Sequence, residues 1–284
     1  MTTIAVTGGS GKAGRAVVRD LLDHGYQVIN IDQVPPAQSL TRFRQSDLTN
    51  LGEVFEALDG TEAVVHLAAI PNPDRYSPGH IFYNNTMSCY HIFTAASQLK
   101  LARVVWASSE TTLGLPFERE QPAYAPIDEE HPLYPESTYA LSKVVTEEMA
   151  RQFNRWSKLP FIGLRFSNIK EPQQYAEFPA YWQDARLRKW NLWGYVDVRD
   201  VAQSCRLGLE APIQGAEVFI IAAADTVMAR PSRDLLAEVF PQVPLRENIE
   251  LHETLLSIDK ARQELGYEPQ FSWRQHIHRE EKTL

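Results

Sequence analysis

The sequence predicts an α/β protein with a doubly wound parallel sheet and a small C-terminal lobe. In the first half of the chain, short apolar runs alternate with longer stretches of helical periodicity, which is the rhythm of βαβ units. The runs are almost wholly apolar rather than alternating, as expected for strands covered by helices on both faces. The predicted strands are Ile4–Thr7, Val28–Asp32, Ala63–Ala68, Val104–Ala107 and Phe161–Phe166.

The segments between and after these runs carry their own signals. The amphipathic stretch Arg15–His24 predicts the first helix. Residues 115–137 are rich in proline and acidic side chains and predict a surface loop, with a helix beginning near Thr138. Residues 257–273 predict a helix that ends at Gly266 and is followed by an exposed tail.

The regular rhythm weakens after Phe166, where Trp, Tyr, Pro and Gln crowd residues 170–193. We therefore expect a first domain over residues 1–166. Residues 167–284 are expected to form the small lobe, partly interleaved with the first domain.

The composition is that of an ordinary globular chain of 284 residues with a formal net charge of −8. Its basic residues are scattered, which argues against partners such as nucleic acid or an anionic membrane. No apolar run is long enough to cross a bilayer and no export signal follows Met1, so we expect a cytoplasmic protein. The two cysteines, Cys89 and Cys205, lie far apart in sequence and favour a reducing compartment; no metal site is expected.

Residues Val6–Gly14 read VTGGSGKAG and lie between the first predicted strand and the first predicted helix. Gly8, Gly11 and Gly14 permit a tight turn and a close approach of backbone amides to a phosphate, and the helix N-terminus adds unpaired N–H groups. Together with Lys12 and Ala13, these glycines predict a cradle for a dinucleotide pyrophosphate and hence a Rossmann-type domain. A simple glycine-rich turn is the alternative.

Asp32 ends the second predicted strand. At this position a carboxylate accepts hydrogen bonds from the adenosine ribose hydroxyls, and its charge repels a 2′-phosphate. Asp32 therefore predicts NAD rather than NADP as the cofactor. A turn or helix-capping role is the alternative, and the nearby Arg42 and Arg44 could weaken the preference.

Tyr139 and Lys143 lie four residues apart in a predicted helix and therefore on one side of it. A phenol is a poor base at neutral pH, but an ammonium group about 4 Å away stabilises its anion by on the order of 4 kcal/mol at intermediate dielectric. The pair predicts a general acid/base for a hydroxyl or carbonyl group. By itself, the same spacing also occurs on solvated helix faces.

Several further segments occur in an order typical of one family. They are the TGGSGKAG loop, the pair Asp47-Leu48, HLAA at 66–69, Asn85, RVVWASSETTLG at 103–114, EEHPLYPESTYALSK at 129–143, LRFSN at 164–168 and YVDVRDVA at 195–202. On these segments the chain resembles the extended short-chain dehydrogenases/reductases, also called the NAD-dependent epimerase/dehydratase family. The resemblance implies a Rossmann-type fold, NAD as the cofactor and a carbohydrate-like small-molecule substrate.

The resemblance also implies a role for each matching residue. Ser109 would hydrogen-bond the reacting oxygen, Tyr139 would be the acid/base, and Lys143 would activate Tyr139 and hold the nicotinamide ribose. The residues that would contact the cofactor or support its site are Asp47, Leu48, Leu67, Ala68, Ala69 and Asn85. Strand-end capping is the alternative for Ser109, and His66, inside an apolar run, is interpreted as a core residue.

The segment that would shape the substrate site is short. Only 26 residues separate Asn168 from Tyr195, whereas nucleotide-sugar enzymes of the family carry a longer insertion there, so the resemblance favours a substrate without a nucleotide handle. The run SNIKEPQQY resembles uronate dehydrogenases. Where those enzymes have polar substrate contacts, this chain has Pro71, Glu110 and Thr111, and Glu110 would repel a carboxylate.

Residues of the small lobe are further candidates for the substrate site. The expected contacts are Asn168, Tyr175, Arg186 and Trp190, with packing as the alternative; Phe178 and Trp193 are interpreted as packing residues.

The leading hypothesis is an NAD-dependent oxidoreductase that acts on a sugar or sugar-like hydroxyl, similar to an aldose or uronate dehydrogenase. One alternative is a nucleotide-sugar epimerase or dehydratase that keeps NAD bound. Another is a non-catalytic NAD sensor, which the complete set of Ser109, Tyr139 and Lys143 argues against. The resemblance also implies a homodimer formed by the helix after Asn85 and the helix that bears Tyr139.

Overall fold

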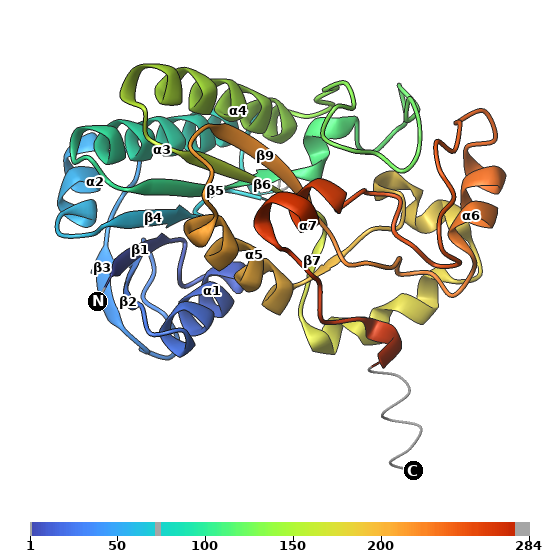
Figure 1. Ribbon diagram of the computed structural model, residues 1–284, viewed down its shortest axis with the longest axis horizontal. Coiled ribbons are helices and arrows are strands. Elements are labelled where there is room, and N and C mark those ends of the chain that lie inside the picture. The colour runs from blue at the N-terminus through green and yellow to red at the C-terminus, as the bar shows by residue number, and fades with distance from the viewer. Residues whose placement is uncertain (1, 72–74, 276–284) are drawn as a thin grey trace, which may run out of the picture.

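A seven-stranded parallel sheet forms the centre of the protein (Figure 1) in the computed structural model, which describes residues 2–71 and 75–275. Its strand order is β3-β2-β1-β4-β5-β6-β9, and every neighbouring pair is parallel. The strands are β1 (Thr3–Thr7), β2 (Gln27–Asp32), β3 (Arg42–Gln45), β4 (Ala63–His66), β5 (Arg103–Ser109), β6 (Phe161–Phe166) and β9 (Ala216–Ile221). The chain changes direction across the sheet between β1 and β4, which is where ligands bind in open α/β sheets.

Helices cover both faces of the sheet, so the predicted doubly wound α/β fold is confirmed. On one face α2 and α4 pack against α3, and on the other α1 packs against α5 (Figure 1). Two separate apolar clusters lie beneath these helices because successive strand residues point to opposite faces: Val64 belongs to one and Val65 to the other. The α-helices are α1 (Lys12–Asp23), α2 (Leu51–Leu58), α3 (Pro78–Gln98), α4 (Thr138–Ser157), α5 (Val198–Glu210), α6 (Ser232–Val239) and α7 (Asp259–Leu265).

The five predicted strands are all present, and the differences lie at their ends. The strand predicted over Ala63–Ala68 ends at His66, so the chain leaves the sheet two residues early. The sheet also extends beyond residue 166, because α5 and β9 come from the part of the chain that we assign to the small lobe.

The small lobe lies beyond the carboxyl ends of the strands and has little regular structure (Figure 1). It is built from 3₁₀-helices, a two-stranded sheet and two short α-helices. The elements outside the main sheet are η2 (Glu110–Leu113), η3 (Pro172–Tyr181), η4 (Ala185–Asn191), β7 (Ile169–Lys170), β8 (Val196–Asp197), α6 and α7. Phe178 and Trp193 are fully buried there, which confirms that they are packing residues.

The segment 115–137 is not the surface loop that its composition predicts. It is irregular, but Phe117, Tyr124 and Ile127 are buried. The backbone N–H of Ala125 donates to Pro244 O at 3.0 Å, and that of Ile127 donates to Leu255 O at 2.8 Å. The backbone of this segment therefore pairs with the small lobe, whereas its proline and acidic residues predict a loop exposed to solvent.

The C-terminal segment is predicted correctly in one part and wrongly in another. Helix α7 ends at Gly266, whose φ of +70° is the left-handed conformation expected of a C-terminal glycine. The following residues do not form an exposed tail, because Tyr267 and Trp273 are buried and donate hydrogen bonds to Ala222 O and Thr226 O. The end of that predicted tail, residues 276–284, lies outside the described residues.

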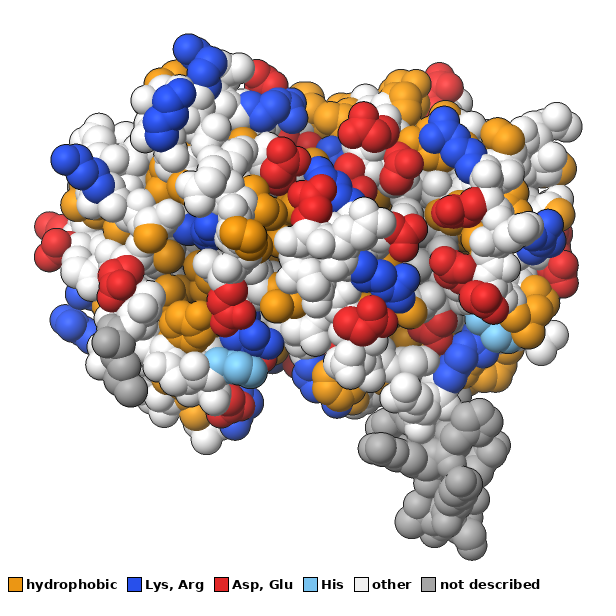
Figure 2. Space-filling view, in the orientation of Figure 1, with side chains coloured by type: hydrophobic (Ala, Val, Ile, Leu, Met, Phe, Trp, Pro, Cys, Tyr) orange, Lys and Arg blue, Asp and Glu red, His pale blue; other side chains and the backbone are white. Residues whose placement is uncertain are grey.

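The surface matches the charge pattern of the sequence. Acidic and basic side chains are interspersed on the face in Figure 2, which carries no broad basic patch. Among the described helices, none combines the length and the apolarity needed to span a bilayer.

Candidate active site

A cleft of about 1110 Å³ lies at the carboxyl ends of the strands. This is somewhat larger than a typical ligand pocket, so it has room for a dinucleotide together with a small substrate. Most of the predicted site residues line it. They are Gly8, Gly11, Lys12, Ala13, Gly14, Asp32, Asp47, Leu48, Leu67, Ala68, Ala69, Pro71, Ser109, Glu110, Thr111, Tyr139, Lys143, Asn168 and Trp190.

The glycine loop forms the floor of one end of the cleft. Gly8 has a φ of +69°, and a Cβ on it would lie 2.7 Å from Ala68 N. A Cβ on Gly14 would lie 2.1 Å from Gly8 O, so neither position accepts a side chain without a backbone shift. These glycines let the loop pack tightly on itself and on the segment after β4, and the N-terminus of α1 adds N–H groups that favour an anion. This geometry suits a pyrophosphate.

Lys12 connects the glycine loop to the small lobe. Its Nζ donates to Gln174 Oε1 at 2.9 Å and to Ile169 O at 3.3 Å. Arg15, one turn further along α1, forms an ion pair of 3.2 Å with Glu171. A contact between Lys12 and a cofactor is therefore expected from its backbone rather than from its ammonium group.

Two carboxylates lie at the other end of the loop. Asp32 accepts backbone N–H bonds from Ser10 at 3.1 Å and Val34 at 3.2 Å, which fixes its carboxylate at the edge of the cleft. Asp47 accepts from the backbone N–H and the hydroxyl of Thr49 at 2.9 and 2.8 Å. These two hydrogen bonds lower the pKa of Asp47, so it is an anion at neutral pH.

Asn85 does not line the cleft but supports its wall. Its side chain accepts from Ile70 N at 2.8 Å and donates to Ile70 O at 3.1 Å. The segment after β4, which lines the cleft, is thereby held by a buried side chain of α3.

The predicted catalytic residues come together at the centre of the cleft. Ser137 caps α4 by accepting from Ala140 N at 3.1 Å, which places Tyr139 in the first helical turn. Lys143 follows one turn later, with its Nζ 5.5 Å from the centre of the Tyr139 ring. The Lys143 ammonium donates to Ala107 O at 2.7 Å, which leaves donors for other partners. Ser109 faces the same cleft from the end of β5.

The hydrogen bonds of Ser109 define what its hydroxyl offers. Its Oγ accepts from the backbone N–H of Thr111 at 3.2 Å and from the Thr111 hydroxyl at 2.9 Å. Ser109 therefore caps η2, as the alternative interpretation holds, and also lines the cleft. Because both acceptor positions of the hydroxyl are used, its own hydrogen is left to donate to a ligand oxygen.

His66 is a core residue, as predicted. It is buried, and its Nδ1 lies 2.7 Å from Thr7 Oγ1. Burial, with a smaller effect from Lys143, lowers its pKa to about 3. The ring is therefore neutral at physiological pH.

Two predicted substrate contacts are wrong. Tyr175 lies in the core, where its hydroxyl donates a hydrogen bond to the buried Asp197. Arg186 lies on the exposed side of η4, where it faces Glu238 on α6 at 3.8 Å. Neither residue lines the cleft. The 3₁₀-helix η3 directs Tyr175 into the core, and η4 directs Arg186 to the surface.

A buried ion pair on α4, next to Lys143, was not predicted from the sequence. Glu147 lies one turn after Lys143 on α4, and its two carboxylate oxygens accept from Arg165 Nε and Nη2, each at 2.9 Å. One of these oxygens also accepts from Ser108 Oγ at 2.6 Å. An arginine within the otherwise apolar run Phe161–Phe166 is the signal that could have revealed this pair.

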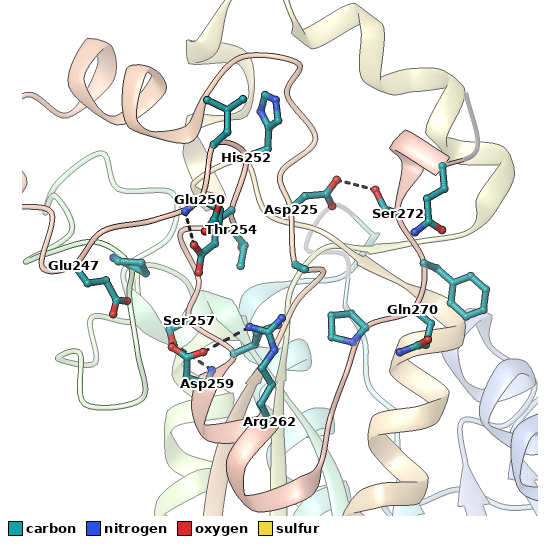
Figure 3. A pocket seen from close by; sticks show the side chains of 18 residues that line it. Asp225, Glu247, Glu250, His252, Thr254, Ser257, Asp259, Arg262, Gln270 and Ser272 are labelled. Atoms are coloured by element: carbon teal, nitrogen blue, oxygen red, sulfur yellow. Dashed lines mark hydrogen bonds and ion pairs between the residues drawn. The ribbon is translucent and has the colours of Figure 1, made fainter. Parts of the chain in front are cut away.

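A second cavity, of about 510 Å³, lies in the small lobe (Figure 3). Two of its carboxylates have partners within the protein: Asp225 accepts from Ser272 Oγ at 2.8 Å, and Asp259 lies 3.6 Å from Arg262. In residues 2–71 and 75–275, no group of His, Cys, Asp and Glu side chains is arranged to hold a metal ion. Because Ser109, Tyr139 and Lys143 all line the larger cleft, we assign the chemistry to that cleft.

Comparison with known families agrees with this geometry. The sequence profile of the NAD dependent epimerase/dehydratase family matches residues 4–222. The chain belongs to this family.

One relative in the epimerase/dehydratase family is a "Putative UDP-glucose 4-epimerase" from Methanocaldococcus jannaschii. It is 30% identical over 180 residues, an alignment that covers 60% of this chain and 57% of the relative. The chain thus spans little more than half the length of this relative.

Two solved structures share the fold. A short-chain dehydrogenase/reductase superfamily protein from Agrobacterium tumefaciens, with bound NAD, has a TM-score of 0.74 and 22% identity over 99% of both chains. A mutated uronate dehydrogenase has a TM-score of 0.70 and 22% identity, covering 98% of this chain and 86% of its own.

NAD is the cofactor of this epimerase/dehydratase family, and the cleft fits it. The pyrophosphate would lie on the glycine loop at the N-terminus of α1, where Gly8, Gly11 and Gly14 line the cleft. Asp32 would accept from the adenosine ribose hydroxyls, and Lys143 would donate to the nicotinamide ribose. When bound, NAD supplies a two-electron acceptor for a hydride from the substrate carbon.

Replacing Asp32 with asparagine is expected to reduce the preference for NAD over NADP by about 10- to 100-fold, because a charge-assisted hydrogen bond is lost together with the repulsion of the 2′-phosphate. Arg44 does not line the cleft, and its guanidinium donates to carbonyls at the end of α2, including Ala57 O. Titration of both cofactors measures the ratio, with Asp23→Asn on the surface as the control. Tighter binding of NADP than NAD by the unaltered protein would contradict this role.

Proposed function

We propose that this protein oxidises a hydroxyl group of a free sugar or sugar-like polyol with NAD, as a dehydrogenase whose substrate lacks a nucleotide handle. The observation that carries the proposal is the convergence of Ser109, Tyr139 and Lys143 on the cleft that also contains the glycine cradle. An acid/base pair beside a dinucleotide site is the arrangement that alcohol oxidation requires.

Each of the three residues has its own role in the proposed reaction. The Tyr139 phenolate oxygen takes the proton of the reacting hydroxyl while the Lys143 ammonium stabilises the phenolate. The Ser109 hydroxyl, whose acceptor positions are occupied by Thr111, donates to the reacting oxygen and orients it. The substrate loses two electrons and two hydrogens in all, one as the proton on Tyr139 and one as the hydride, and becomes a carbonyl compound.

The size of the small lobe supports a substrate without a nucleotide. The 26 residues between Asn168 and Tyr195 contain two 3₁₀-helices whose side chains Tyr175, Phe178 and Asn191 are buried. Much of this segment is therefore used for packing. Little of it is left to enclose a nucleotide diphosphate.

The second candidate is a nucleotide-sugar epimerase or dehydratase that retains its NAD, supported by the similarity to the UDP-glucose 4-epimerase relative. A panel of free aldoses, uronates, polyols and UDP-sugars, followed at 340 nm and by product chromatography, separates the two. Steady NADH formation with a free sugar is expected. Conversion of a UDP-sugar without net NADH would overturn the dehydrogenase proposal.

We also propose a homodimer through α3 and α4. Tyr90, Leu141 and Trp156 on these helices expose 41%, 42% and 58% of their surfaces, which leaves apolar area on both helices for a partner to cover. Light scattering at micromolar concentration is expected to give twice the monomer mass, and Leu141→Glu combined with Trp156→Glu is expected to halve it. A monomer mass for the unaltered chain would contradict the dimer.

The state of the two cysteines is relevant to the cellular compartment in which the protein works. Cys89 and Cys205 are both buried free thiols. Reduced thiols support the assignment to the cytosol.

A further inference from the structure

Glu110 is an acidic side chain in the part of the cleft that surrounds the reacting group. It follows Ser109 directly and lines the same cleft, yet only 3% of its surface is exposed. A substrate that contacts the Ser109 hydroxyl therefore shares this cleft with Glu110.

Neighbouring side chains hold this carboxyl group in place. Its Oε2 accepts from Ser167 Oγ at 2.6 Å, and its Oε1 accepts from Asn191 Nδ2 at 3.2 Å. The backbone N–H of Asn168 donates to it as well. All three of these groups donate to Glu110. Its carboxyl group is therefore held in one position and acts as a hydrogen-bond acceptor.

The cation whose charge acts on Glu110 is Arg188, which does not line the cleft. The lysines that line the cleft are Lys12, bonded to Gln174, and Lys143, bonded to Ala107 O beside Tyr139. The guanidinium of Arg188 lies behind Glu110, where it donates to Gly194 O and stacks on Trp190. Burial raises the pKa of Glu110 to about 7, despite the opposing effects of Ser167, Asn191 and Arg188.

Two buried amide oxygens also lie in this part of the molecule. Asn168 lines the cleft, and its Oδ1 is buried with no hydrogen-bond partner among the described residues. Asn191 Oδ1, next to Glu110, also has none in that part of the chain. Hydroxyl groups can donate to such oxygens, whereas the oxygens of a carboxylate or phosphate can only accept.

We propose that Glu110 is a specificity-determining residue that, together with Asn168, selects an uncharged polyhydroxy substrate over one that carries a carboxylate. This inference rests on the proposed function, since it names the substrate class of the same site. A neutral sugar donates hydroxyl hydrogens to Glu110 and Asn168. A hexuronate brings a second anion to a cleft that already contains a buried acid, and the two lysines that line the cleft are bonded to groups other than that acid.

The test compares a matched pair of substrates, galactose and galacturonate, which differ by one carboxylate. With NAD and the unaltered protein, kcat/KM is expected to favour the neutral sugar by about 100-fold or more. In Glu110→Gln this ratio is expected to fall at least about 10-fold, mainly through a lower KM for the acid. Glu110→Asp, which keeps the charge, is expected to retain the preference.

Controls separate the possible failures. Glu118→Gln, an exposed glutamate on the following loop, is expected to leave the ratio unchanged. The unaltered protein alone gives a first check. If it oxidises galacturonate as efficiently as galactose, the role of Glu110 is overturned while the proposed function stays intact. If a folded Glu110→Gln protein keeps the same ratio of kcat/KM for the two sugars, the role of Glu110 is likewise overturned. If no free sugar of either kind yields NADH, it is the proposed function that fails.

Discussion

Replacing Tyr139 with phenylalanine is expected to lower turnover of the substrate by about 100- to 10,000-fold, the range that general acid/base catalysis contributes. The variant keeps the ring, the helix and the Lys143 ammonium, and loses only the oxygen that takes the proton. NAD binding is expected to change little, because the cradle at Gly8 and Gly14 lies elsewhere in the cleft.

Single-turnover rates, thermal unfolding midpoints and NAD titration together measure this effect. Tyr26→Phe is the matched control, since the Tyr26 hydroxyl bonds to Glu210 and does not line the cleft. Turnover by Tyr139→Phe within about twofold of the unaltered protein would remove Tyr139 from the mechanism. A tenfold or greater loss of NAD affinity would instead mean that the phenol serves cofactor binding.

The buried pair of Glu147 and Arg165 is expected to dominate the effects on stability. Glu147→Ala should lower the free energy of unfolding by about 3–5 kcal/mol, because it leaves the Arg165 guanidinium buried without its partner. It also removes the acceptor of Ser108, the residue before Ser109, so we expect turnover to fall as the end of β5 loosens.

Urea unfolding measures the loss, and the adjacent Glu148 provides the control. Glu148 bonds to Arg151 at the surface, where half of each side chain is exposed, so Glu148→Ala is expected to cost under about 1 kcal/mol. Replacing both members of the buried pair, in Glu147→Leu with Arg165→Met, is expected to recover part of the stability. Equal losses for Glu147→Ala and Glu148→Ala would show that burial of the pair has no energetic consequence.

Much of the fold was accessible from local sequence. The apolar runs located five of the strands, and the glycines between the first run and the first helix located the cradle. Ser137 and Gly266 mark a helix start and a helix end through local hydrogen bonds and backbone conformation. These features were predictable because each depends on residues within a few positions of one another.

The errors have a common physical cause. Tyr175 and Arg186 were assigned to the cleft from composition and position, but the turns of η3 and η4 direct one into the core and the other to the surface. Residues 115–137 and the segment after Gly266 carry polar and proline-rich sequences, and both are nevertheless covered by distant parts of the chain. Local composition does not contain that information.

By itself the sequence indicated five strands of the sheet, the glycine loop and the proposed acid/base pair, because strand burial, glycine conformation and helical spacing act over short distances. Only the tertiary structure decided the surroundings of that pair: the Glu147–Arg165 ion pair behind it and the carboxyl group of Glu110 beside it. Partners such as Ser167 and Asn191 lie 57 and 81 positions from Glu110 along the chain, so only folding brings them together. Desolvation and hydrogen bonding at a site depend on such partners, and these two effects set the pKa of its ionisable groups.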